Sequence, residues 1–366
     1  MPARRRAARM GRRRGIESRD RPRPWRIVVA MNMKSLLVLV ALLCSAPAHL
    51  IAAGGQDCAT VWRAHMTELG RLLALSDEPT DVILAARFGV GEPDEAGARM
   101  VRARALNPDA AGWWRMATDC AGDFRHCDRA AAILELQRID ANNGAVWFLP
   151  APWSEADTDR RLRQIAASPR FDTYFAEWLR RYLTALERLP LPASSRDADS
   201  PGHGIAPSEA QLRFTWAMGM AQTDLLPGLS GLSRACRESA STKLAPERKS
   251  LCIAALRRMM ANADLYLVQQ VAAKRLAALL IGPAREEVVR ARRRAAWQFA
   301  AWQESDGADG GTDAAADARR FDARMAAWRE PGATELDVMR SRLLAAGIAR
   351  EPPAGWQGSI WSEDED

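Results

Sequence analysis

Residues 119–147 read DCAGDFRHCDRAAAILELQRIDANNGAVW, and this stretch decides how the chain is expected to fold. Cys120 ends one helix-forming segment, Cys127 begins the next, and Gly122 and Asp123 lie in the turn between them. On an unbroken helix a separation of seven residues covers about 10 Å. Because a disulfide joins Cα atoms roughly 4.4–6.8 Å apart, the two cysteines can bond only across a tight turn. The stretch therefore predicts a helical hairpin closed by a disulfide between Cys120 and Cys127.

His126, beside Cys127, makes a zinc site the alternative interpretation of the same stretch. Structural zinc takes four ligands at short paired spacings. Here six residues separate the two cysteines, and no second pair follows. We expect a disulfide, with free or differently paired cysteines as the remaining alternatives, and we predict no metal and no cofactor.

Cys236 and Cys252 repeat this arrangement. A helix-forming stretch ends near Cys236, residues 241–246 form a turn, and Pro246 lies in the first turn of the next helix. Cys252 shares a helix face with Leu256, so we expect it to point at the preceding helix and to bond to Cys236. Each disulfide would stabilise the fold by roughly 3 kcal/mol through its restriction of the unfolded chain. Cys58 is left over: it is free, pairs between chains or joins one of the other cysteines.

The first 53 residues differ from the rest of the chain. Residues 31–53 have the layout of a secretory signal peptide, with Lys34, an apolar run from Leu36 to Cys44, and small residues at 46–48 and 51–53. The run of nine is shorter than the roughly 20 apolar residues that a spanning helix needs. We therefore expect a periplasmic or secreted protein with no stable membrane span after cleavage.

Residues 1–30 carry eleven arginines against Glu17 and Asp20 and supply all of the net charge of +7. Without them the protein is close to neutral, so we expect no nucleic-acid partner. An Arg-rich segment has no ordinary role in front of a signal peptide. We interpret residues 1–30 as sequence upstream of the true start, at Met31 or Met33. The alternative is a signal-anchored membrane protein with a basic cytoplasmic arm.

After residue 56 the apolar residues recur at helical spacing almost everywhere, and the fold class is predicted to be all-α. Helices are expected at 56–75, 171–189 and 264–280, the last with Asp264 as its cap, and Ser154 is expected to cap another. The organisation follows from breaks in this pattern: a repeat-like region 56–187, a linker 188–208, a second helical region 209–303, a flexible loop 304–319, C-terminal helices 320–348 and an acidic tail 349–366. The linker allows two helical lobes.

LNPDAAGWW at 106–114 and IDANNGAVW at 139–147 align with an offset of 33 residues. Two helices and a turn lie between them, with Trp113 or Trp114 early in the first helix and small residues such as Ala117 on the facing sides. This unit resembles a tetratricopeptide-like helical repeat over residues 106–147. The resemblance implies antiparallel helical hairpins stacked in a solenoid, and it says little about function.

No motif for a phosphate loop, a zinc protease or a serine hydrolase is present in the sequence. Carboxylates such as Asp172 and Glu177 are expected on solvated helix faces, paired with arginines such as Arg180. Trp356 and Trp361, in the acidic tail, are candidates for contact with a partner. We therefore expect a scaffold for another protein or a peptide, with no catalytic residue assigned. The alternative is an exported hydrolase that uses carboxylates in a groove between helices.

Overall fold

The computed structural model describes residues 58–89, 93–120, 126–149, 153–192, 208–222, 229–238, 243–307 and 314–356. Some predictions fall outside these residues: the Arg-rich segment 1–30, the signal peptide 31–53, Gly122 and Asp123, and Trp361. Cys58 is the first residue of a helix, but its side chain is also outside the description.

Helices account for nearly all of the regular structure, and the predicted all-α class is confirmed. Among the described residues no strand forms, and only two isolated β-bridges occur. The described elements are α2 (Cys58–Leu73), α3 (Pro79–Phe88), α4 (Pro93–Ala105), α5 (Ala110–Asp119), α6 (Arg129–Ile139), the 3-10 helix η2 (Gly144–Phe148), α7 (Glu155–Ala167), α8 (Phe175–Leu186), α9 (Glu209–Gln222), α10 (Leu229–Ala235), α11 (Pro246–Asn262), α12 (Tyr266–Leu279), α13 (Gly282–Gly307), α14 (Ala314–Arg329) and α15 (Glu335–Ala345).

Local sequence signals explain where several helices begin. Ser154 caps α7 by accepting a hydrogen bond from the backbone N of Asp157 at 3.2 Å, as predicted. Asp109 and Asp128 cap α5 and α6 in the same way. Pro246 is the first residue of α11. A backbone N–H at this position has no partner within the helix, so proline, which lacks one, fits there without loss of a hydrogen bond.

Two predicted boundaries differ from the structure. The helix expected at 171–189 begins only at Phe175, because residues 168–174 form a nonhelical connection that bonds to other parts of the molecule. The loop expected at 304–319 is shorter, since α13 continues to Gly307 and α14 begins at Ala314. Alanine-rich sequence favours helix at the start of α14.

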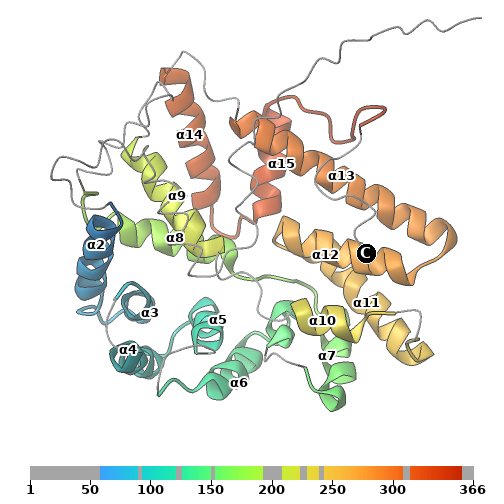
Figure 1. Ribbon diagram of the computed structural model, residues 1–366, viewed down its shortest axis with the longest axis horizontal. Coiled ribbons are helices and arrows are strands. Elements are labelled where there is room, and N and C mark those ends of the chain that lie inside the picture. The colour runs from blue at the N-terminus through green and yellow to red at the C-terminus, as the bar shows by residue number, and fades with distance from the viewer. Residues whose placement is uncertain are drawn as a thin grey trace, which may run out of the picture.

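The helices follow one another around the molecule and return to their starting side (Figure 1). Among the early helices, α3 packs on both α2 and α4, and α5 packs on α6. Further along the chain, α11 packs on α7 and α12, and α12 packs on α13. Near the end of the chain α14 lies against α8, which also contacts α2, α3 and α9. Arg180 of α8 donates hydrogen bonds to the backbone oxygens of Trp328 and Glu330, at 3.5 and 3.1 Å.

One apolar core connects the helices on both sides of the predicted linker 188–208. It includes Leu69 of α2, Tyr182 of α8, Phe214 of α9 and Trp328 of α14. Phe175 and Trp328 meet edge to face with ring centroids 5.9 Å apart. Early and late helices are thus joined by shared burial of apolar surface, which is the main source of stability in such a fold.

The predicted repeat has two dissimilar copies. Residues 110–119 form the α-helix α5, whereas the aligned end of the second copy forms the short 3-10 helix η2. The backbone also differs at aligned positions, since Asn107 has φ 55° and Asp140 has φ −133°. A stack of equivalent hairpins is not confirmed.

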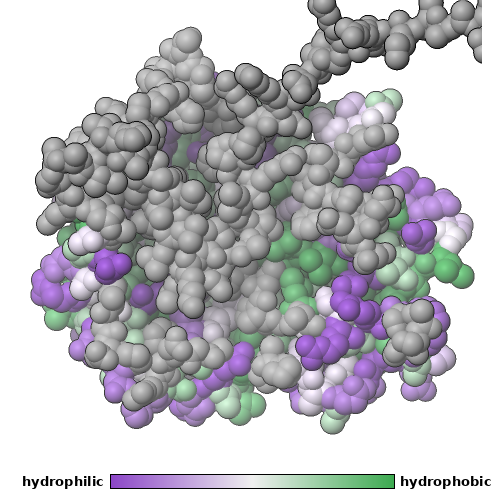
Figure 2. Space-filling model, viewed as in Figure 1, coloured by the Kyte–Doolittle hydropathy of each residue, from purple (hydrophilic) through white to green (hydrophobic). Residues whose placement is uncertain are grey.

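The exposed face of the described helices is mixed in character. Figure 2 shows hydrophilic residues along the outer edge over α4, α6 and α7, with small hydrophobic patches between them. Of the helices that the structure describes, none combines the length and apolar character needed to cross a membrane.

Candidate carboxylate site

Residues 168–174 form a nonhelical segment, here called the crossing segment. It pairs with two parts of the chain that are far apart in the sequence, near Asn143 and near Ala263. On one side it forms a β-bridge from Arg170 to Asn143, where Gly144 donates a backbone hydrogen bond to the Arg170 oxygen at 2.9 Å. On the other side Phe171 bridges to Ala263, between α11 and α12, and the Asp264 backbone N donates to the Phe171 oxygen at 3.1 Å. The segment therefore ties the α6–η2 corner to the start of α12.

Asn143 fixes the first corner through its side-chain amide. Its Oδ1 accepts from the backbone N of Asp172 at 2.9 Å, and its Nδ2 donates to the backbone O of Asp172 at 2.8 Å. This pair of hydrogen bonds imitates a strand pairing at a single residue. Because Asn143 is fully buried, its amide needs these partners to offset the loss of water.

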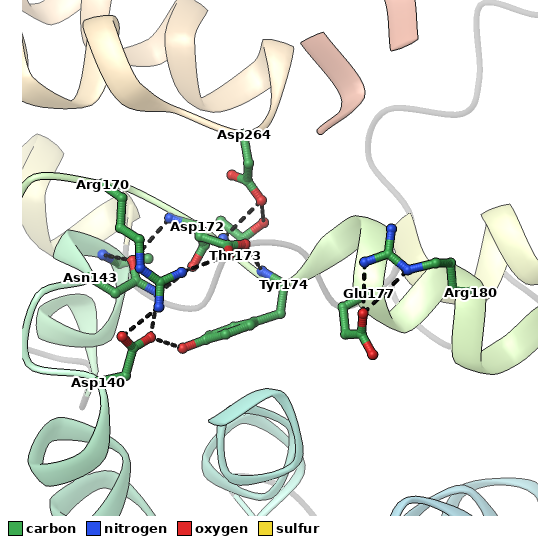
Figure 3. Close-up of polar contacts among 10 residues, drawn as sticks. Asp140, Asn143, Arg170, Asp172, Thr173, Tyr174, Glu177, Arg180 and Asp264 are labelled. Atoms are coloured by element: carbon green, nitrogen blue, oxygen red, sulfur yellow. Dashed lines mark hydrogen bonds and ion pairs between the residues drawn. The ribbon is translucent and has the colours of Figure 1, made fainter. Parts of the chain in front are cut away.

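Asp140, the C-cap residue of α6, gathers a group of donors at this corner. Arg170 donates to its Oδ1 at 2.5 Å, Asn143 donates to its Oδ2 at 3.1 Å, and the Tyr174 hydroxyl donates to the same Oδ2 (Figure 3). Burial and the neighbouring Asp140 carboxylate raise the pKa of Tyr174 above its usual range, so the hydroxyl keeps its proton. Tyr174 reaches Asp140 from a left-handed backbone conformation, with φ 58°.

Asp172 is the most accessible aspartate of this group. Its Oδ1 accepts from the backbone N of Tyr174 at 2.7 Å, and its Oδ2 accepts from Arg170 at 2.9 Å. The side chains of Arg170 and Asp172 are 45% and 37% exposed, so this edge of the site reaches solvent. Burial raises the pKa of Asp172, and the Tyr174 backbone bond and Arg170 oppose that rise.

Asp264 lies deeper, at the start of α12. Only 5% of the residue is exposed, and its Oδ2 accepts from the backbone N and the Oγ1 of Thr173, at 2.8 and 2.7 Å. Burial raises the pKa of Asp264 well above its ordinary value, and the charge of Asp172 raises it further. The predicted role of Asp264 as the N-cap of α12 is wrong: Leu265 is the capping residue, and the Asp264 side chain bonds across the molecule instead.

Glu335 brings a further carboxyl group to the same helix end. As the first residue of α15, it accepts a hydrogen bond from the backbone N of Tyr266 at 2.8 Å. Tyr266 follows Asp264 by two residues, so the two acids flank the first turn of α12. Burial raises the pKa of Glu335 to about 7, and the Tyr266 bond partly opposes the rise.

The three aspartates Asp140, Asp172 and Asp264 have Arg170, Thr173 and Tyr174 as their partners. They are here called the central carboxylate cluster together with Glu335, whose own partner is the backbone N of Tyr266. Burial raises the pKa of Asp264 and of Glu335, and raised carboxyl pKa values are common at functional sites. Within the described part of the chain, no group of acidic, histidine or cysteine side chains has an arrangement that could hold a metal ion.

The predicted cysteine pairs are brought together. Cys120 and Cys127 have Cα atoms 5.4 Å apart between α5 and α6, and Cys236 and Cys252 have Cα atoms 5.6 Å apart between α10 and α11. Each pair lies at disulfide distance at the end of a helical hairpin, which fits an oxidising environment. Neither pair contributes a group to the central carboxylate cluster.

Trp356 does not project from the molecule as an isolated partner-binding side chain. It is half-buried and meets Trp297 of α13 edge to face, with ring centroids 5.6 Å apart. Residues before it also lie along α13, since Trp297 donates to the Ala349 oxygen at 2.9 Å and Gln298 donates to the Arg350 oxygen at 3.0 Å. The first part of the predicted acidic tail is therefore attached to α13.

Reasoning from the sequence missed most of the cluster. Asp172 was expected on a solvated helix face, but it precedes α8 and belongs to the crossing segment. Glu177 does pair with Arg180 and Arg181, at 2.7 and 2.8 Å, as expected for a helix surface. The run Asp172-Thr173-Tyr174 contains the relevant side chains, but nothing local in it points to Asp264.

Comparisons with protein-family models, with curated proteins and with solved structures found no match to this chain.

Proposed function

We propose that this chain is an exported protein whose packed helices serve as a scaffold for another protein or a peptide. Export, to the periplasm or beyond, is supported by the signal-peptide pattern at 31–53. It is also supported by the two cysteine pairs at disulfide distance, because such bonds persist in oxidising compartments. We also propose that residues 106–147 are one unit of a tetratricopeptide-like helical repeat.

The observation that carries the scaffold proposal is a hollow between the end of α4 and the hairpin of α5 and α6. It has a volume of about 380 Å³ and is lined by Arg104, Trp113, Ala131, Leu134 and Glu135. Trp113 forms a buried apolar floor at 5% exposure, whereas Leu134 is 68% exposed at the edge. The lining mixes the apolar side chains of Trp113, Ala131 and Leu134 with the charged side chains of Arg104 and Glu135, so a ligand there would meet both kinds of group.

The charges around the hollow favour a particular kind of partner. Arg104 pairs with Asp128 at 3.6 Å, and both side chains are about half exposed, so this ion pair is weak and open to exchange. Glu135 is already bonded to Arg138. The expected ligand is a peptide segment that places an apolar side chain over Leu134 and an acidic group beside Arg104.

A site-specific photo-crosslinking experiment tests this proposal. A crosslinking residue is placed at position 134 in the hollow and, in a matched variant, at position 75, since Leu75 is 73% exposed elsewhere on the surface. Position 134 should yield a defined adduct in the native cell envelope that position 75 does not. Leu134→Glu should abolish capture of the same partner, and Leu75→Glu should retain it. Equal labelling at both positions would remove the support for the hollow.

The central carboxylate cluster favours a second candidate, an exported hydrolase. Burial raises the pKa of Asp264 and of Glu335, and the Asp172 side chain reaches solvent at the edge of the cluster. General acid catalysis uses carboxyl groups with such raised pKa values. The test is turnover of a panel of peptide, ester and glycan substrates by the wild-type protein and by Asp264→Asn and Glu335→Gln. Turnover that is equal in all three proteins would exclude the cluster as its source.

A further inference from the structure

After α15 the chain returns along α13, and residues 348–356 of the returning segment are here called the strap. Two consecutive residues of α13 donate side-chain hydrogen bonds to two consecutive carbonyl groups of the strap. Trp297 Nε1 donates to the Ala349 oxygen at 2.9 Å, and Gln298 Nε2 donates to the Arg350 oxygen at 3.0 Å. This part of α13 therefore recognises backbone carbonyl groups, which every peptide segment has.

Two side-chain contacts give the surface a preference beyond the backbone. Arg294 forms an ion pair with Glu351 at 2.7 Å. Trp297 and Trp356 meet edge to face with ring centroids 5.6 Å apart, a favourable arrangement for two aromatic rings. Arg293 also donates to the backbone oxygen of Trp356. The surface thus takes a carboxylate and, further along the same segment, an aromatic ring.

A turn in the strap sets the spacing of these two groups. The backbone N of Trp356 donates to the Pro353 oxygen at 3.1 Å, which closes the turn. Gly355 lies inside it with φ 79°, a conformation that favours glycine. Pro352 and Pro353 restrict the backbone ahead of the turn. The strap is therefore partly preorganised to place Glu351 and Trp356 on the surface.

The strap is attached by few buried groups. Ala349, Arg350 and Glu351 are exposed. The side chains of Arg294 and Glu351 are 38% and 65% exposed, so their ion pair contributes little to stability. Segments with few buried contacts open locally at a low free-energy cost. Gln298 is only 6% exposed with the strap in place, so its amide needs the carbonyl acceptor that the strap supplies.

We propose that this face of α13 is a binding surface for a segment of another protein, and that the strap occupies it in cis until that segment displaces it. The segment supplies carbonyl acceptors, a carboxylate for Arg294 and an aromatic side chain for Trp297. Arg290 and Arg293 on the same helix add positive charge, which favours an acidic partner. The surface adds to the proposed scaffold role and shares no residue with the hollow of α4–α6.

The test measures binding of a synthetic peptide of residues 348–356, with blocked ends and a fluorophore, by fluorescence anisotropy. The protein is the full-length chain, as wild type and as the strap variant Glu351→Ala/Trp356→Ala, which lacks both side-chain contacts. The strap variant should bind the peptide about tenfold or more tightly than the wild type, because an intact strap competes at a high effective concentration. A control peptide with alanine at both positions should bind the strap variant about tenfold or more weakly.

Two further changes, each made in the strap variant, locate the bound peptide. Trp297→Phe removes the N–H donor but keeps an aromatic ring, and it should weaken peptide binding by about fivefold. Leu134→Glu alters the hollow and should leave the affinity unchanged. Loss of binding in Leu134→Glu would place the peptide in the hollow and overturn the assignment to α13. Failure of the hollow to capture a partner leaves these expected results as they are.

Three other results would overturn the proposal. The first is an absence of peptide binding to the strap variant, and the second is equal affinity for the strap variant and the wild type. The third is a wild-type dimer in sedimentation velocity that Trp356→Ala dissociates, because the occupant would then be the strap of a second copy. If the double variant does not fold, Trp356→Ala alone replaces it and should also bind the peptide more tightly than the wild type.

Discussion

Thr173 donates two hydrogen bonds to one oxygen of Asp264, across a sequence separation of 91 residues. Both residues are at least nine-tenths buried, with exposures of 4% and 5%. This contact joins a segment that precedes α8 to the start of α12, so it connects the two halves of the chain through nonhelical residues. Variants that remove one donor of Thr173 measure how much that hydrogen bond adds to the stability of the fold.

Thr173→Val removes the hydroxyl donor but keeps the size and the backbone N of Thr173. We expect a loss of about 1–3 kcal/mol in the free energy of unfolding, because Asp264 then has one buried donor fewer. Urea denaturation at fixed pH measures the loss. Thr173→Ser retains the hydroxyl and should lie closer to the wild-type protein; if both variants were equally unstable, packing rather than the hydroxyl would explain the effect.

Glu335→Gln tests the raised pKa at the α12–α15 contact. Burial raises the pKa of Glu335 from 4.5 to about 7, so the folded protein keeps a proton that the unfolded chain has lost. The contribution is therefore fully present below about pH 4.5 and decreases as pH rises toward about 7. Over this range wild-type stability should fall relative to Glu335→Gln by about 3 kcal/mol. Parallel pH–stability curves for the two proteins would contradict the assignment.

The two disulfides should contribute unequally. Cys236 and Cys252 are separated by 16 residues in the sequence and Cys120 and Cys127 by 7, so the first pair closes the longer loop. On the loop-entropy model the first is worth about 3 kcal/mol and the second about 2 kcal/mol. Denaturation of the Cys236→Ala/Cys252→Ala and Cys120→Ala/Cys127→Ala double variants measures each contribution. Non-reducing peptide mapping of the wild-type protein should recover both linked peptides, and recovery of all four cysteines as free thiols would show that neither bond forms.

Gly70→Ala tests the close approach of α2 and α3. A Cβ atom at Gly70 would lie 2.8 Å from the backbone N of Gly89, at the end of α3. Backbone atoms cannot move aside as a flexible side chain does, so we expect a net loss of about 1–2 kcal/mol even though alanine favours helix. Thermal unfolding measures the loss. Thr67→Ala, at an exposed position in the same helix, is the control and should be close to neutral.

The features that the sequence predicts well are those with local causes. Cys120 and Cys127 meet because one turn separates their helices, and Ser154 and Pro246 act on the backbone within one helical turn. The same local reasoning fails at Asp264. Its position before an apolar helix is typical of an N-cap, but the donors of Thr173, 91 residues away, decide its actual partner.

The helix predicted at 171–189 shows the second reason for failure. The aromatic residues of 171–175 fit a helical stripe, but Phe171, Asp172 and Tyr174 take part in contacts that a continuous helix would not allow. Tertiary contacts override the local preference here. Periodicity predicts α8 itself and cannot predict where its first turn begins.

The contacts of Arg180 have a consequence for the timing of folding during synthesis. Its partners, Trp328 and Glu330, are 148 and 150 residues further along the chain. As the polypeptide is synthesised, the face of α8 that contacts α14 lacks these partners until about 150 further residues have appeared. Such late closure exposes apolar surface to aggregation in the meantime. A chaperone that covers this face during emergence would therefore have its strongest effect on chains truncated just before Trp328.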